Sequence, residues 1–115
     1  MMDERIENWL IYVRETAQQS LEFVEGLIRE QFLKDTRNQQ ACAMNLLLIG
    51  STAKRIVERQ PSFADRHPDI AWKEMMSMRN RIAHEYDAID FNIVWDTITE
   101  DLPELIAQID DLLSQ

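Results

Sequence analysis

Apolar residues recur every three or four positions along most of the chain, which is the spacing of one face of an α-helix. No stretch alternates polar and apolar residues for long enough to predict a strand. The 115 residues are 45% hydrophobic and include only two glycines and three prolines, a composition typical of a folded chain with one core. The sequence therefore predicts an all-α fold, an antiparallel bundle of four to five helices in a single domain, residues 1–115.

The periodicity predicts four main helices, at residues 4–31, 36–58, 69–85 and 91–113. Asp3 and Asp90 stand where N-caps are expected, before the first and the last of them. Gly26 lowers the helix propensity of the first segment without ending its apolar stripe, so we expect the helix to continue past it. Pro103 lies inside the last segment, where it should kink or restart the helix.

Two further features concern the connections and the packing. Residues 60–69 contain two prolines and are predicted to form the one clear loop. The small residues at positions 50–53 allow a neighbouring helix to approach the second helix closely, and that helix is expected to be the most buried. The single cysteine, Cys42, cannot form an intramolecular disulfide and is expected to be a small core residue. Together with the absence of a long apolar run, this favours a cytoplasmic protein without a membrane anchor.

Charge is distributed unevenly along the chain. The net charge is −9, which argues at first against a nucleic-acid ligand. However, residues 54–84 carry seven Lys or Arg against four Asp or Glu, whereas residues 85–115 carry nine acidic residues and no Lys or Arg. The acidic quarter is either a solvated surface or a face that repels nucleic acid or recruits a basic partner.

The most informative stretch, Met78–Tyr86, lies in the basic segment. Arg79 can bind a phosphate and stabilise negative charge, and His84 can exchange protons near neutral pH, a pair suited to cleaving an RNA phosphodiester. Residues five apart on a helix point roughly 140° apart, so the two side chains converge only if the helix frays near His84 or if two chains face each other. The structural alternative is that Arg79 forms a salt bridge, His84 lies near the helix C-terminus as a favourable cation and Tyr86 packs against the turn.

The stretch resembles a known family. Arg79, His84 and Tyr86 match the Arg-x4-His-x-Tyr signature of the HepT-like toxins of the HEPN superfamily, and the similarity extends over about residues 68–106. The resemblance implies a HEPN-like helical homodimer with the two motifs facing each other. It implies a metal-independent endoribonuclease without a cofactor, acting on RNA as the toxin of a type VII-like toxin–antitoxin pair. It also implies an adjacent-gene minimal nucleotidyltransferase as the antitoxin, which can transfer AMP to the motif tyrosine.

The resemblance assigns roles to individual residues. Arg79 would bind the scissile phosphate and His84 would transfer protons. Asn80, four residues before His84 and on the same helix face, would orient the imidazole or a phosphate oxygen. Tyr86 would accept the AMP. Four further basic residues could contact the RNA backbone or could be merely solvated: Lys54, Arg55, Arg59 and Arg81.

Two other functions stay open on the sequence alone. The chain could be a non-catalytic helical module that serves a separate nucleotidyltransferase, which the acidic net charge favours. It could also be a structural dimer without activity. No Cys, His or carboxylate spacing around the motif predicts a metal site.

Overall fold

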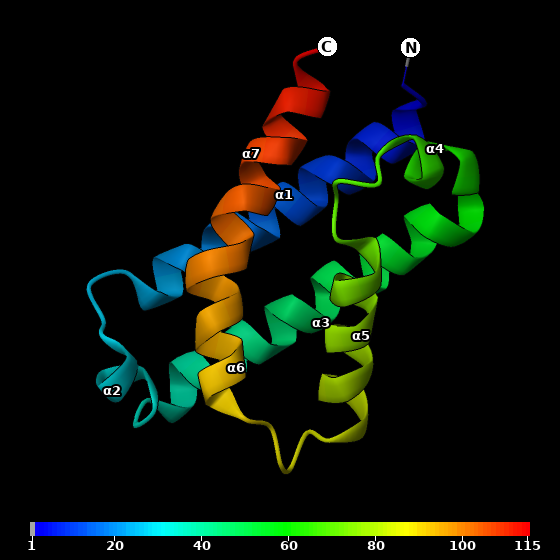
Figure 1. Ribbon diagram of the computed structural model, residues 1–115. Coiled ribbons are helices and arrows are strands. Elements are labelled where there is room, and N and C mark those ends of the chain that lie inside the picture. The colour runs from blue at the N-terminus through cyan, green and yellow to red at the C-terminus, as the bar shows by residue number, and fades with distance from the viewer. Residues whose placement is uncertain (1) are drawn as a thin grey trace.

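The computed structural model describes residues 2–115 and contains no strand in that range (Figure 1). The helical elements are α1 (Glu4–Val24), α2 (Arg29–Phe32), α3 (Thr36–Arg59), α4 (Pro61–Arg66), α5 (Trp72–His84), α6 (Phe91–Asp96), the π-helical turn η1 (Thr97–Asp101) and α7 (Leu102–Leu113). The segments α6, η1 and α7 follow one another without a break, so α1, α3, α5 and this composite helix form the predicted all-α bundle.

Helix α3 lies at the centre of the arrangement. It packs along α1 on one side and along α5 on the other, and α7 packs against α1. As predicted, α3 contributes the largest number of buried residues, and Cys42 in its first half is fully buried. Burial raises the pKa of the Cys42 thiol to about 12, so the thiol stays protonated and behaves as a small core side chain.

The contact between α1 and α3 includes a buried polar cluster around Asn45. The Asn45 amide donates to Gln19 Oε1 and to Ser20 Oγ, both at 3.1 Å, and Ser20 Oγ donates to the carbonyl of Thr16 at 2.9 Å. Asn45, Ser20 and Thr16 are all buried. Buried polar groups are costly unless they are paired, so this cluster favours one position of α3 along the axis of α1.

Helix α1 ends earlier than the sequence predicts. The expected helix over residues 4–31 stops at Val24, and Gly26 has φ +79°, in the left-handed region that glycine adopts readily. The chain turns here, and Arg29–Phe32 form the separate helix α2, whose Phe32 packs against Phe91 and Trp95. The prediction that the helix continues past Gly26 was therefore wrong, because an apolar stripe does not reveal a reversal of backbone direction.

The prediction that residues 60–69 form a loop was wrong for part of the segment, because Pro61–Arg66 form helix α4. Pro61 occupies the first turn, where its fixed φ favours a helix and its missing N–H costs no hydrogen bond. Phe63 and Ala64 are buried, and this burial stabilises a helix too short to persist alone. The following helix begins at Trp72 and not at Asp69.

The effect of Pro103 is a π-helical turn. Proline lacks an N–H and its ring clashes with the carbonyl four residues earlier, so a regular helix is disfavoured there. The backbone instead widens over Thr97–Asp101, and the N–H of Leu102 donates to the carbonyl of Thr97, five residues before it. The N-caps predicted at Asp3 and Asp90 are confirmed, since each carboxylate accepts a backbone N–H two residues later.

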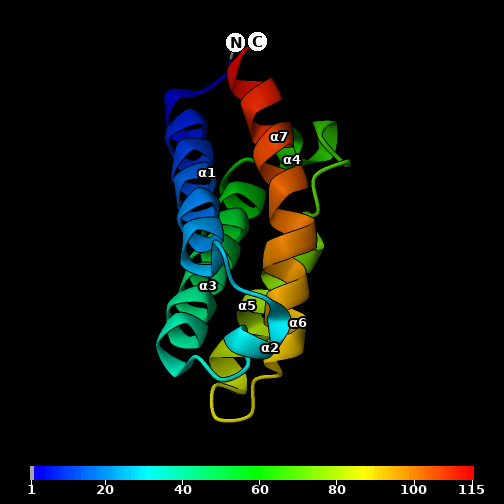
Figure 2. The same cartoon turned by 90° about the vertical axis from the view of Figure 1, so that its left-hand side faces the viewer.

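The two ends of the described chain lie near each other, opposite the connection between α5 and α6 (Figure 2). That connection, residues 85–90, protrudes at the far end of the bundle and carries Tyr86. Among the described residues, no helix is long and apolar enough to cross a membrane.

Replacing Asn45 by alanine should lower the free energy of unfolding by about 1–3 kcal/mol, because Ser20 Oγ and Gln19 Oε1 lose their partner. Urea denaturation followed by circular dichroism measures the change. Gln40→Ala, at an exposed position on the same helix, is the control and should change stability by less than about 0.5 kcal/mol. An Asn45→Ala variant as stable as the control would show that the cluster does not stabilise the α1–α3 contact.

Candidate functional site

The candidate site begins where α5 crosses α3. A Cβ atom at Gly50 would lie 2.3 Å from Arg79 Cβ and 2.5 Å from the carbonyl oxygen of Met75, distances that no side chain tolerates. The two helices can therefore touch at this height only because residue 50 has no side chain. This confirms the predicted close approach at the small residues 50–53, and it shows that the approaching helix is the one that carries the motif.

The same crossing positions Arg79. Its Nε donates to Ser51 Oγ at 3.3 Å, and its Nη1 donates to Asn80 Oδ1 at 3.0 Å. Arg79 is half-buried, and the guanidinium makes no ion pair among the described residues. The predicted alternative of a structural salt bridge is thus not what holds Arg79. Neutral partners fix the side chain and leave its positive charge uncompensated, which suits a group that binds an anion.

His84 is the last residue of α5 and is exposed. Helix α5 stays regular through His84, and Glu85 closes it by donating its N–H to the carbonyl of Arg81. Arg79 and His84 therefore point roughly 140° apart within one chain. Asn80 is exposed on the side of α5 that carries His84, but its amide oxygen contacts Arg79, and no hydrogen bond joins it to His84 among the described side chains.

Tyr86 lies just beyond the end of α5 with 78% of its surface exposed, which excludes the alternative that it closes the helix end by packing. It lines an open groove between the first half of α3 and the end of α5. The groove is also lined by Met44, which is 55% exposed, and by Leu47, Ile82 and Ile89. His84 does not line this groove, so within one chain Tyr86 and His84 do not share it.

The basic residues of α3 continue from the Arg79 contact. Lys54 and Arg55 follow Ser51 by three and four positions, so they lie one turn further along the same face of α3, about 5 Å along the axis. Both are exposed, as are Arg59, a turn beyond, and Arg81 on α5. None of these four residues forms an ion pair in the described part of the chain.

One face of α3 thus combines three kinds of surface. Gln40, Met44, Leu47, Ser51 and Lys54 recur at intervals of four and three, which places them on one stripe of the helix. The stripe is apolar beside Tyr86, holds Arg79 at its middle and is basic beyond it. The sequence did not indicate Ser51 as a site residue, because a serine in a run of small residues has no distinctive pattern.

An all-α bundle whose penultimate long helix ends in Arg-x4-His and is followed by an exposed tyrosine defines a HEPN-like helical domain. The profile of the family described as "Ribonuclease HepT-like" matches residues 13–112, and the chain belongs to this family. The predicted resemblance is thereby confirmed, and it extends well before residue 68.

Several similar proteins carry names of the same class. The chain is 30% identical to "Putative RNase TTE0752" of Caldanaerobacter subterraneus over 93% of each chain. It is 35% identical to "Probable ribonuclease HepT" of Thermococcus cleftensis over 79% of this chain and 80% of the relative. It is 26% identical to "Putative RNase MJ0127" of Methanocaldococcus jannaschii over 98% of this chain and 91% of the relative. No solved structure matches the chain significantly.

Gly50→Ala tests the contact between α3 and α5, because the sign of the change in stability depends on whether α5 lies against residue 50. At an open helical position this change stabilises by about 1 kcal/mol, whereas here the added methyl meets Arg79 and the Met75 carbonyl, and we expect a loss of about 1–3 kcal/mol. Thermal and urea denaturation give the sign. An increase in stability would show that α5 does not rest on Gly50.

Proposed function

We propose that the protein is a metal-independent endoribonuclease that acts as a homodimer and forms the toxin of a HEPN/minimal-nucleotidyltransferase toxin–antitoxin pair. Membership of the HepT-like ribonuclease family supports the class of activity. The arrangement of Arg79 and His84 supports the mechanism. The antitoxin is the adjacent-gene minimal nucleotidyltransferase that the motif implies.

One observation carries the dimeric mechanism: α5 remains helical through His84. A regular helix end argues against fraying as the way in which Arg79 and His84 meet. The remaining way is a site formed between two chains, in which symmetry brings two arginines and two histidines together. This arrangement also supplies the two proton-transfer groups that the reaction needs, since each chain offers one His in the motif.

The surface beside the motif supports this assembly. Met44 and Tyr86 are large and exposed, and they border a groove whose remaining walls are apolar or uncharged. Contiguous apolar surface next to an uncompensated cation is typical of an interaction face. In the dimer we propose, the apolar end of the α3 stripe contacts the partner, and Lys54 and Arg55 at the other end contact the RNA backbone.

The reaction would be a phosphoryl transfer within the RNA. The imidazole of His84 removes the proton of a ribose 2′-OH, and the 2′-oxygen attacks the adjacent phosphorus. The 5′-oxygen of the next nucleotide leaves and takes a proton from the partner's His84, which yields a 2′,3′-cyclic phosphate and a free 5′-hydroxyl. Arg79 neutralises the charge that accumulates on the phosphoryl oxygens of the pentavalent intermediate. Asn80 holds Arg79 in place through its amide oxygen.

The proposed control of the enzyme is AMP transfer from ATP to Tyr86. In the single chain Tyr86 is 78% exposed, so a second enzyme could reach the phenol where the partner does not cover it. The resulting phosphodiester carries a negative charge, and the attached adenosine is bulky, so in the dimer the modification would occupy the space that RNA needs beside Arg79. Blocking then requires no refolding.

The net charge of −9 favours a second candidate, a non-catalytic module that binds a nucleotidyltransferase. The two candidates differ in whether the purified protein cleaves RNA in EDTA. Under the proposed function, Arg79→Ala and His84→Ala abolish this cleavage, while the matched variants Arg37→Ala and His67→Gln retain it. If the two motif variants cleave RNA normally, or if the wild-type protein needs Mg²⁺, the proposed mechanism fails.

Mixed dimers test whether the site is shared. When wild-type protein and His84→Ala protein are denatured and refolded together in equal amounts, random pairing leaves about one quarter of the dimers with two His84 side chains. We expect cleavage to fall to about one quarter of the wild-type rate, because both histidines serve one site. Independent sites in each chain would instead leave about one half.

The protein's two tyrosines allow a matched test of Tyr86. Incubation with the neighbouring nucleotidyltransferase and ATP should raise the intact mass by AMP and stop RNA cleavage. Tyr86→Phe should show neither change. Tyr12 on α1 is 42% exposed, and Tyr12→Phe should behave as the wild type. A mass gain that persists in Tyr86→Phe would assign the modification to another residue.

A further inference from the structure

We propose that the cleft between α5 and the η1–α7 segment binds a basic, amphipathic segment of a protein partner, whose apolar side chain enters the cleft while Lys or Arg residues contact its rim. This inference does not rest on the ribonuclease activity. It rests on the shape, chemistry and position of the cleft.

The cleft exists because α5 is attached to the bundle mainly through α3 (Figures 1 and 2). Between α5 and η1–α7 lies a cavity of about 230 Å³ that opens to solvent. The apolar part of its walls comes from three elements: Leu46 and Ile49 of α3, Met75 and Met78 of α5, and Leu102 and Leu105 of α7. The volume is below that of a typical small-molecule pocket and is suited to one large side chain.

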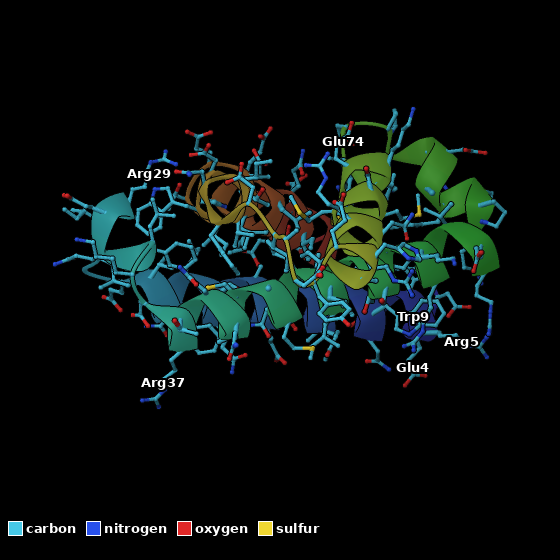
Figure 3. All side chains as sticks on the ribbon, turned by 90° about the horizontal axis from the view of Figure 1, so that it is seen from below. Glu4, Arg5, Trp9, Arg29, Arg37 and Glu74 are labelled. Atoms are coloured by element: carbon cyan, nitrogen blue, oxygen red, sulfur yellow. The ribbon has the colours of Figure 1, made fainter. Side chains whose placement is uncertain are left out.

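Four carboxylates line this cleft. Asp69 and Glu74 stand on the α5 side, and Asp101 and Glu104 stand on the α7 side. Figure 3 labels Glu74, which lies on the side of α5 turned toward α6 and α7. No Lys or Arg lines the cleft, and none of the four carboxylates takes part in an ion pair in the described part of the chain.

The α7 side of the rim belongs to the most acidic part of the chain. The last quarter of the chain, residues 85–115, contains no Lys or Arg at all. The pKa of Asp101 is raised by burial first, and then by the negative charges of Glu104 and Asp96. A cation placed at this rim would relieve the repulsion among the carboxylates, whereas an RNA phosphate would increase it.

The cleft lies on a different side of α5 from Asn80 and His84. Met75 and Met78 line it, and by helical geometry they lie on the side of α5 roughly opposite Asn80 and His84. A partner in the cleft would therefore leave free the motif face of α5, the side that carries Asn80 and His84, whereas Arg79 lies next to Met75 and Met78 on the helix. A dimer formed through the motif face would leave one cleft open on each protomer.

The chemistry of the walls selects a protein segment as the occupant. Two methionines offer a flexible, polarizable surface of the kind that accommodates the side chains of amphipathic helices. An apolar side chain in a desolvated pocket surrounded by charge pairs is a common energetic centre of protein interfaces. The acidic rim would speed the encounter with a basic partner and make the binding sensitive to salt.

Methionine methyl groups provide the readout. The protein is labelled with ¹³C at the Met methyl positions and titrated with a helical peptide that carries Leu on one face and Lys at the flanking positions. The expected result is a shift of the Met75 and Met78 signals with micromolar affinity, and no shift of Met44 in the other groove. The same peptide with Glu in place of Lys should not bind.

Charge variants distinguish the effect of the rim carboxylates on binding from the effect of the net charge of the protein. Glu74→Gln/Glu104→Gln removes two rim charges, and Glu15→Gln/Glu22→Gln removes two exposed charges from α1 and leaves the same net charge. We expect the rim variant to bind the Lys peptide about 10-fold more weakly and the α1 variant to bind as the wild type does. Met78→Gln should also weaken binding, because it makes the wall polar at nearly constant volume.

Three results would overturn the proposal. One is that the Met75 and Met78 signals stay in place at millimolar Lys peptide. Another is that the two double variants bind this peptide equally, which would mean that only net charge matters. The third is that a single-stranded RNA oligonucleotide shifts Met75 and Met78 in place of the peptide, which would identify the cleft as a nucleic-acid site.

Discussion

The contact of α5 with α3 at Gly50 is the constraint on which the candidate site depends. Because residue 50 has no Cβ, the backbone of α5 lies against α3 at Met75 and Arg79. That closeness brings the guanidinium of Arg79 within hydrogen-bonding distance of Ser51, a neutral partner that leaves the positive charge unpaired among the described residues. It also fixes the rotation of α5, and this rotation decides that Arg79 faces α3, that His84 faces solvent and that Met75 and Met78 line the cleft.

The sequence was sufficient to predict the helical bundle and the identity of the motif. Apolar periodicity located α3 to within one residue, and capping carboxylates marked the starts of α1 and α6. The sequence pattern did not predict the points at which the backbone changes direction or a short helix begins. Gly26 turns the chain although the apolar residues on both sides keep helical spacing, and Pro61 starts a helix in a stretch whose prolines suggest a loop.

The candidate site was predictable as a set of residues but not as an arrangement. The spacing of Arg79 and His84 indicates that they diverge on a regular helix, and only the observed end of α5 shows that the helix is regular up to that point. The role of Ser51 and the separation of Tyr86 from His84 depend on how α5 lies on α3, which no local pattern encodes. The asymmetry of charge, in contrast, is visible in the sequence, and the structure places part of its acidic end around an apolar cleft.

The π-helical turn at Thr97–Asp101 has a consequence for how this chain can vary. It places one residue more in the helical path than a regular helix would hold, so α6 can face α2 and α3 while α7 faces α1. Each residue added or removed there would rotate the side chains of α7 by about 100° relative to α6 and turn Leu105, Ile109 and Leu112 away from the core. Substitutions at Glu100 and Asp101, the exposed positions of this turn, therefore leave the orientation of α7 unchanged, whereas a change in the length of the turn does not, and Ile98 is held in the core.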